Sequence, residues 1–193
     1  MREKKALFWW KSERLQRLVV IMKSVLHNAA AALLLLVAPS AFSALAVGDL
    51  APRFVIEGAL DGKAVTVDLL ELVNEGPLVI YFFPSAFTDR GASLDFANNI
   101  ERFHAAGTNV VGVSRDSIDT LTRFSSEVCG GLFPVASATE SLVNAFDVND
   151  GAMFNTRTTY VVDPLGKIVF VHDDQDYRGH VEKVLDFLQA WKQ

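Results

Sequence analysis

The residues from Val79 to Ala97, VIYFFPSAFTDRGASLDFA, lead from an apolar run through a proline into a predicted helix. The first N–H groups of a helix have no partner within the helix, and the helix dipole favours negative charge beside them. A cysteine in such a position ionises readily and reacts as a thiolate. The position where a nucleophile is expected in this stretch holds Gly91, which has no side chain to react.

The only cysteine of the chain, Cys129, lies in the segment RFSSEVCGG, at the C-terminal end of a predicted helix. A helix C-terminus raises the pKa of a thiol, so we expect Cys129 to be a poor thiolate. A single cysteine also cannot form an intramolecular disulfide. Two interpretations of Cys129 remain: a thiol with a redox role, or a small buried residue without one.

Other polar residues of interest also have two interpretations. Arg90 adds positive charge that could hold an anion near the helix start, or it is a solvated loop arginine. Thr88 is suited to cap the helix. The segment VHDDQD, which ends at Asp176, has ligand types suited to calcium but not the spacing of a known loop, and we interpret it as a polar turn. The remaining histidines, His27, His104 and His180, are scattered and form no metal pattern. The sequence has no glycine-rich phosphate loop and no Cys-x-x-Cys motif, so no cofactor is expected either.

The elements that must position these residues alternate between strands and helices. Two strands joined by a helix are expected to lie parallel, and a final hairpin adds an antiparallel edge. The sequence therefore predicts an α/β fold, a thioredoxin-like sandwich with a mixed central sheet flanked by helices. The predicted elements are a strand pair around the turn Asp61-Gly62 with a brief helix after it, a strand over 77–83, a helix over 92–106, a strand over 109–114, a helix capped by Asp116 or Ser117, a short helix over 141–146, a hairpin around 163–166 and a last helix with Val181, Val184, Leu185, Leu188 and Trp191 on one stripe.

Residues 1–46 have the features of a signal-peptide region. Residues 29–38 are ten consecutive apolar residues, which suits a signal-peptide core of ~7–15 residues better than a membrane span of ~20. Small residues end this region at Ala46, where we expect cleavage and export to the bacterial periplasm. Met22 begins a complete signal peptide by itself and is a candidate for the true start. The alternative is an uncleaved N-terminal anchor.

Charge divides the chain at the same point. The first 46 residues contain seven of the 18 Lys and Arg residues and two of the 23 Asp and Glu residues. The remaining 147 residues therefore contain 11 basic and 21 acidic residues, which gives them a net charge of −10. An acidic body argues against nucleic acid as a partner, because phosphates must be neutralised. Residues 47–193 are long enough for one domain with one core.

The segment YFFPSAFTDRG resembles the active loop of the peroxiredoxin family, whose pattern is proline, three residues, threonine, two residues and the peroxidatic cysteine. Pro84 and Thr88 match the first two positions, and Gly91 falls on the cysteine. The segment NTRTTYVVDPLGKI is similar to the one that supplies the family's active-site arginine, here Arg157. The resemblance covers about residues 47–192 and is closest to the bacterioferritin-comigratory-protein-like branch of the alkyl hydroperoxide reductase and thiol-specific antioxidant superfamily.

This resemblance implies a role for each matching residue. In the family the proline shields the sulfur, the threonine hydroxyl holds the peroxide, and the arginine stabilises the anionic sulfur and the developing charge on oxygen. The cysteine becomes a sulfenic acid, which a second thiol resolves. Pro84, Thr88 and Arg157 are thereby expected to line a pocket for a hydroperoxide or a small anion, with a thioredoxin-like protein as reductant. Cys129 matches a position where several relatives carry the resolving cysteine.

Two functions are compatible with these residues. The first is a homologue of the antioxidant enzymes that has lost most or all peroxidase activity, because Gly91 cannot be oxidised, and that binds through the retained pocket or a surface. The alternative is an active thioredoxin-dependent peroxidase or reductase that works through Cys129. Fold alone does not decide between them.

Overall fold

The computed structural model describes residues 44–88, 90–151 and 153–191. Most of the predicted signal-peptide region, including Met22, therefore lies outside the described residues. Within the described ranges, no helix has both the length and the apolar character that crossing a membrane requires.

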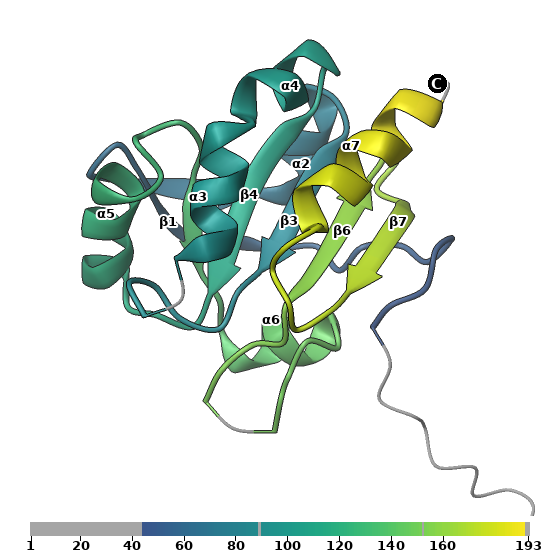
Figure 1. Ribbon diagram of the computed structural model, residues 1–193. Helices are drawn as coiled ribbons and strands as arrows, with labels where there is room; N and C mark the ends of the chain where they lie inside the picture. The colour runs from purple at the N-terminus through teal and green to yellow at the C-terminus, as the bar shows by residue number, and fades with distance from the viewer. Residues whose placement is uncertain (1–43, 89, 152, 192–193) are drawn as a thin grey trace, which may run out of the picture. The chain divides into compact units, whose positions relative to one another are not determined.

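Seven strands form one mixed sheet in the order β2-β1-β5-β4-β3-β6-β7. Figure 1 shows the part of this order that runs from β4 through β3 and β6 to β7. Strands β3, β4 and β5 are parallel to one another, whereas the pairs β1–β2, β1–β5, β3–β6 and β6–β7 are antiparallel. The predicted parallel centre and antiparallel final hairpin are confirmed. The strands are β1 (Val55–Leu60), β2 (Lys63–Asp68), β3 (Leu78–Phe82), β4 (Asn109–Ser114), β5 (Val135–Ser137), β6 (Thr158–Val162) and β7 (Ile168–Asp173).

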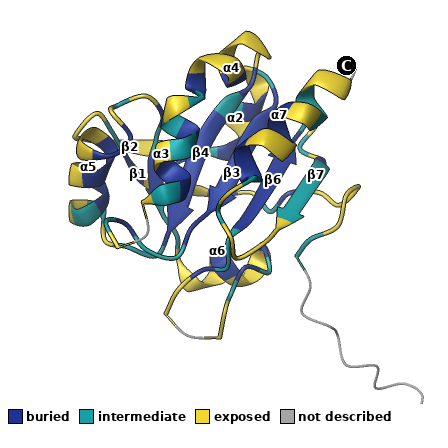
Figure 2. Ribbon diagram, viewed as in Figure 1, coloured by how far each residue is buried: buried dark blue, intermediate teal, exposed yellow. Residues whose placement is uncertain are grey.

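Helices cover both faces of this sheet and leave their outer sides exposed (Figure 2). One face is covered by α3, α4, α5 and α7, and the other by α2 and α6. The helices are α2 (Leu69–Asn74), α3 (Gly91–Asn98), α4 (Ile100–Ala105), α5 (Ile118–Glu127), α6 (Glu140–Ala145) and α7 (His180–Ala190).

Strand β3 connects the two layers of the core. Successive side chains of a strand point to opposite faces, so every second residue belongs to the same cluster. Val79 and Tyr81 pack with the α3–α4–α5–α7 layer, and Leu78, Ile80 and Phe82 pack with the α2–α6 layer. All five are buried, which explains why the sequence here is apolar on both faces.

The first hairpin has a turn whose residues fit its backbone. Asp61 and Gly62 both have positive φ angles, 49° and 72°. A two-residue hairpin loop of this kind matches the twist of the strands, and aspartate followed by glycine is a favoured pair for it. The predicted turn at these residues is confirmed.

The prediction differs from the structure in one helix and lacks one strand. The helix expected over 92–106 is two helices, α3 and α4, with a break at Asn99, whose φ and ψ are −114° and 8°. The Asn99 side chain donates to the Asp95 carbonyl oxygen at 2.8 Å, and asparagine side chains compete in this way with helix hydrogen bonds. Strand β5 was not predicted at all, because its three residues are too short to show a period.

Candidate functional site

The loop between β3 and α3 is held in place by an aspartate from the next βα connection. The Ala86 N–H donates to Asp116 Oδ2 at 2.7 Å, and the Ser114 hydroxyl donates to the same oxygen at 2.8 Å. Phe87 has a φ of 51°, a conformation that a bulky residue rarely adopts, and its ring packs edge-on against Phe124 at 5.3 Å. Packing and the aspartate therefore support a strained loop at the site of the sequence motif.

Helix α3 begins at Gly91, one residue before the predicted start. Arg90 is its N-cap, and the Arg90 side chain makes no capping hydrogen bond. Thr88 is exposed and lies two residues before the N-cap Arg90, so the interpretation of Thr88 as the cap of the helix is wrong. Arg90 is exposed, as a solvated loop arginine would be.

The space beside Gly91 is occupied by Tyr177, from the loop between β7 and α7. A Cβ atom on Gly91 would lie 2.7 Å from Cζ of Tyr177 and 2.8 Å from its Cε1. Real Cβ atoms do not approach carbon atoms this closely, because the van der Waals distance is about 3.5–4.0 Å. Any side chain on Gly91 therefore requires the ring to move.

Arg157 lies immediately before β6 and faces the same enclosed space as Tyr177. Its carbonyl oxygen accepts a hydrogen bond from the Asp174 N–H at 3.2 Å, which joins the start of β6 to the loop after β7. The space has no room for a water molecule. It is lined by Tyr81, Phe82, Ala92, Phe96, Arg157, Thr159, Tyr177 and His180.

His180 is the buried polar group at the base of this loop. Its Nε2 lies 2.9 Å from the Asp174 carbonyl oxygen, which can only accept, so Nε2 carries the proton. Nδ1 therefore accepts from the Thr159 hydroxyl at 2.8 Å. Burial lowers the pKa of His180, so the imidazole is neutral at pH 7 and both its nitrogens are satisfied.

Beneath the first turn of α3, a buried hydrogen bond joins the helix to the sheet. The Tyr81 hydroxyl donates to the Ser93 hydroxyl at 2.9 Å, and both residues are almost fully buried. The Tyr81 ring stacks on Phe96 with centroids 4.2 Å apart. The start of α3 is thus fixed to β3 by both a polar and an aromatic contact.

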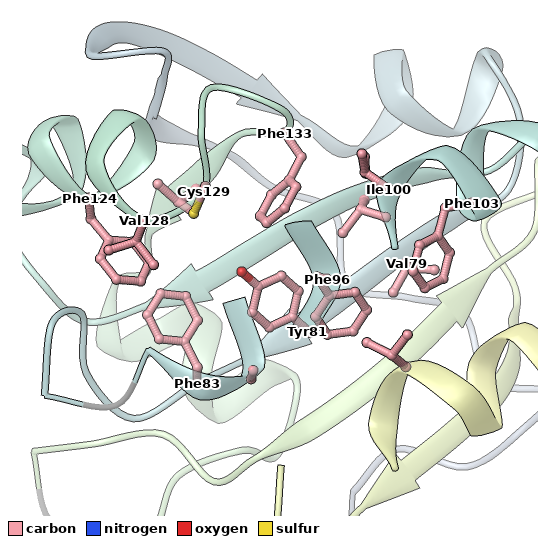
Figure 3. Close-up of a cluster of buried hydrophobic side chains, with 14 of the residues drawn as sticks. Val79, Tyr81, Phe83, Phe96, Ile100, Phe103, Phe124, Val128, Cys129 and Phe133 are labelled. Atoms are coloured by element: carbon pink, nitrogen blue, oxygen red, sulfur yellow. The ribbon is translucent and has the colours of Figure 1, made fainter. Parts of the chain in front are cut away.

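Cys129 follows α5 and is completely buried. It belongs to an apolar cluster with Phe124, Val128 and Phe133, among which Figure 3 places its sulfur. Burial raises the pKa of the Cys129 thiol to about 12. The direction is the one predicted, but its main cause is burial in the core and not the helix terminus.

Pro84 lines a different depression. This surface hollow has a volume of about 360 Å³ and is open to solvent. Two of its lining residues, Met153 and Phe154, are exposed apolar side chains, with 77% and 45% of their surface accessible. The hollow is lined by Pro84, Arg115, Asp116, Met153 and Phe154.

The residues of the sequence motif are thus only partly gathered. Arg157 and the start of α3 face one enclosed space, whereas Pro84 lines the open hollow and Thr88 lines neither.

Tyr177 is a residue of the site that the sequence did not predict. The signal for it was indirect: a glycine at the first position of a helix leaves a gap in the packing, and a large side chain elsewhere in the chain has to fill it.

The segment VHDDQD, predicted as a polar turn, is a turn only in its second half, because Val171, His172 and Asp173 are the last residues of β7. Asp174 Oδ1 accepts from the Asp176 N–H at 3.0 Å, and Asp176 forms an ion pair with Arg178 at 2.8 Å. Within the described ranges, no group of three or more His, Cys, Asp or Glu side chains could hold a metal ion.

Comparison with known proteins gives the same family that the motif suggested. The pattern of the AhpC/TSA family matches residues 47–171. Among curated proteins, Peroxiredoxin Bcp of Xanthomonas campestris is 34% identical over 123 residues, 58% of this chain and 76% of the relative. Peroxiredoxin Bcp of Escherichia coli K12 is 27% identical over 155 residues, 75% and 96% of the two chains.

Solved structures agree with the fold. Peroxidoxin BcpB of Mycobacterium tuberculosis superposes with a TM-score of 0.68 at 26% identity, covering 76% of this chain and 98% of the other. A mutant of Xylella fastidiosa PrxQ gives a TM-score of 0.67 at 27% identity, covering 77% and 98%. The predicted thioredoxin-like fold is confirmed.

Proposed function

Because this chain belongs to the AhpC/TSA family, as a peroxiredoxin of the Bcp-like branch, we propose that it is a family member without thiol-dependent peroxidase activity. Peroxiredoxin chemistry needs a thiolate that a hydroperoxide can reach. In this proposal Gly91 stands at the position of the peroxidatic cysteine and supplies no sulfur. The protein then has a binding role in place of a catalytic one.

The observation that carries this proposal is the state of the only thiol in the chain. Cys129 has no exposed surface and a pKa raised to about 12. At pH 8 such a thiol is ionised in roughly one molecule in ten thousand, so even a peroxide that reached it would meet a neutral sulfur. The alternative function, a thioredoxin-dependent peroxidase or reductase acting through Cys129, would require the core to open.

The binding role is assigned to an outer surface. The enclosed space beside Arg157 has no room for a water molecule, and hence none for a hydroperoxide or a small anion. The open hollow beside Pro84 has the volume that such a role requires. A hydroperoxide and a thioredoxin-like reductant are the partners of the alternative function.

We expect the purified protein to consume hydrogen peroxide no faster than buffer when a complete thioredoxin system is supplied, because it presents no accessible thiolate. The assay is NADPH oxidation, with Escherichia coli Bcp as the positive control. Cys129→Ala should give the same background rate. Alanine is the matched replacement, because a serine hydroxyl would be buried among rings.

Two outcomes would contradict this expectation. Turnover in the parent that disappears in Cys129→Ala would establish the alternative function. Turnover that persists in Cys129→Ala would point to a reactive group other than the thiol. Labelling by a thiol reagent provides a control, since Cys129 should react only after the protein is unfolded.

We also propose export to the bacterial periplasm, with translation starting at Met22 and cleavage near Ala46. The ten-residue apolar core and the small residues before Val47 support this. Mass spectrometry of the protein recovered from a periplasmic fraction should give an N-terminus within a few residues of Val47. Recovery of the full-length chain from membranes would support the uncleaved anchor instead.

A further inference from the structure

Gly91 and Tyr177 come from distant parts of the chain and meet at the start of α3. Gly91 is the first residue of that helix, and Tyr177 lies in the loop between β7 and α7. A Cβ atom on Gly91 would lie 2.7, 2.8 and 3.0 Å from three atoms of the Tyr177 ring. The ring therefore occupies the volume into which a side chain at this position would extend.

The Tyr177 ring also has a structural environment of its own. It is partly buried and packs against the core cluster on the α3 face of the sheet. Together with Ala92, Arg157 and His180 it encloses the space described above, which has no room for water. A missing side chain in a packed protein normally leaves a costly void, and here an aromatic ring fills it.

We infer that Tyr177 closes the candidate site by taking the place of the side chain that Gly91 lacks. The inference rests on the proposed function, because that proposal identifies Gly91 as the nucleophile position. The inference adds a second residue to the difference from an active peroxiredoxin site. Gly91 supplies no sulfur, and Tyr177 excludes small ligands from the start of α3. The start of α3 is then part of the core and not a binding pocket.

The backbone of Gly91 makes this inference testable with a small substitution. Its φ is not in the left-handed region, so alanine can adopt the same conformation. In a helix alanine is favoured over glycine. Gly91→Ala should therefore destabilise a protein that has an aromatic ring at residue 177. It should stabilise a protein in which residue 177 has no ring.

The experiment compares Gly91→Ala in three backgrounds by thermal unfolding. In the parent, we expect the Tm to fall by roughly 3–10 °C, as for an overpacked core. In Tyr177→Ala, the same substitution should leave the Tm unchanged or raise it by roughly 1–4 °C. Tyr177→Phe is the matched control, because it keeps the ring atoms, and Gly91→Ala should lower its Tm as in the parent.

A second measurement does not depend on Tyr177→Ala folding. The Tyr177 ring resonances in the NMR spectrum should shift in Gly91→Ala, because the ring must move away from the new methyl group. An equal Tm change in all three backgrounds, or unchanged ring resonances, would overturn the inference. Neither readout involves peroxide, so peroxidase activity in the parent would refute the proposed function and leave this result standing.

Discussion

Gly91→Cys combined with Tyr177→Ala should create a reactive thiol, whereas Gly91→Cys alone should create a hindered one. The cysteine would sit at the N-terminus of α3, where the N-cap residue Arg90 makes no side-chain capping hydrogen bond. Free N–H groups and the helix dipole lower a thiol pKa below its usual ~8.5. With Tyr177 in place, the ring lies within 3 Å of the new Cβ and obstructs the sulfur.

The expected difference between the two variants is large. We expect alkylation by iodoacetamide at pH 7 to be about 10–100 times faster in the double variant, because it has both more thiolate and better access. All variants carry Cys129→Ala, so that the introduced cysteine is the only thiol of each variant. The pH dependence of the rate gives the pKa of the new cysteine directly.

Two matched variants isolate the causes. Gly91→Cys with Tyr177→Phe keeps the ring and should react as slowly as Gly91→Cys alone. Leu94→Cys places a thiol on the same helix at an exposed position, 39% accessible, one turn from the N-terminus, and should have an ordinary pKa. The two comparisons separate obstruction by the ring from the effect of the helix dipole.

Reaction with hydrogen peroxide gives the functional readout of the same variants. The thiolate attacks one peroxide oxygen, the O–O bond breaks, and sulfenic acid and water form once the leaving oxygen takes a proton. Mass spectrometry should detect one added oxygen in the double variant within minutes. Rapid oxidation of Gly91→Cys with Tyr177 intact would mean that the ring moves aside easily, and an inert double variant would mean that α3 no longer activates a thiol.

The sequence predicted those parts of the fold whose pattern is local. Strand β3 is apolar on both faces because it lies inside the sheet, and the first turn has the residues that its φ angles require. Strand β5 could not be predicted, because its three residues are strand only through pairing with β1 and β4. At the break at Asn99, the side chain donates to the Asp95 carbonyl oxygen and so competes with the hydrogen bonds of the helix.

The candidate site was harder to predict than the fold. The motif identified Gly91 and Arg157, and the structure places Arg157 and Ala92 around one space. It could not indicate what fills that space, because Tyr177 reaches Gly91 only through the path of β7 and its following loop. The poor ionisation of Cys129 was predicted from the helix terminus, but burial in the core, which no local pattern reports, is the main cause.

Tyr81→Ala should cause the largest loss of stability of any single substitution considered for this protein. Tyr81 is 1% exposed, and its ring contacts the rings of Phe83, Phe96 and Phe133 at centroid distances of 5.6, 4.2 and 6.0 Å. Removing a buried aromatic ring costs about 3–5 kcal/mol, which is a large part of the stability of a typical domain. Urea unfolding should show the loss as a lower midpoint.

Tyr81→Phe separates the hydroxyl group from the ring. It leaves the Ser93 hydroxyl buried without its donor, which should cost about 1–3 kcal/mol, and Tyr81→Phe with Ser93→Ala should recover part of that loss. Ser93 lies in the first turn of α3, so the hydroxyl pair connects the stability of the core to the position of Gly91. If Tyr81→Phe instead unfolds with the midpoint of the parent, the hydrogen bond does not anchor α3, and the fixed position of Gly91 against Tyr177 must come from ring packing alone.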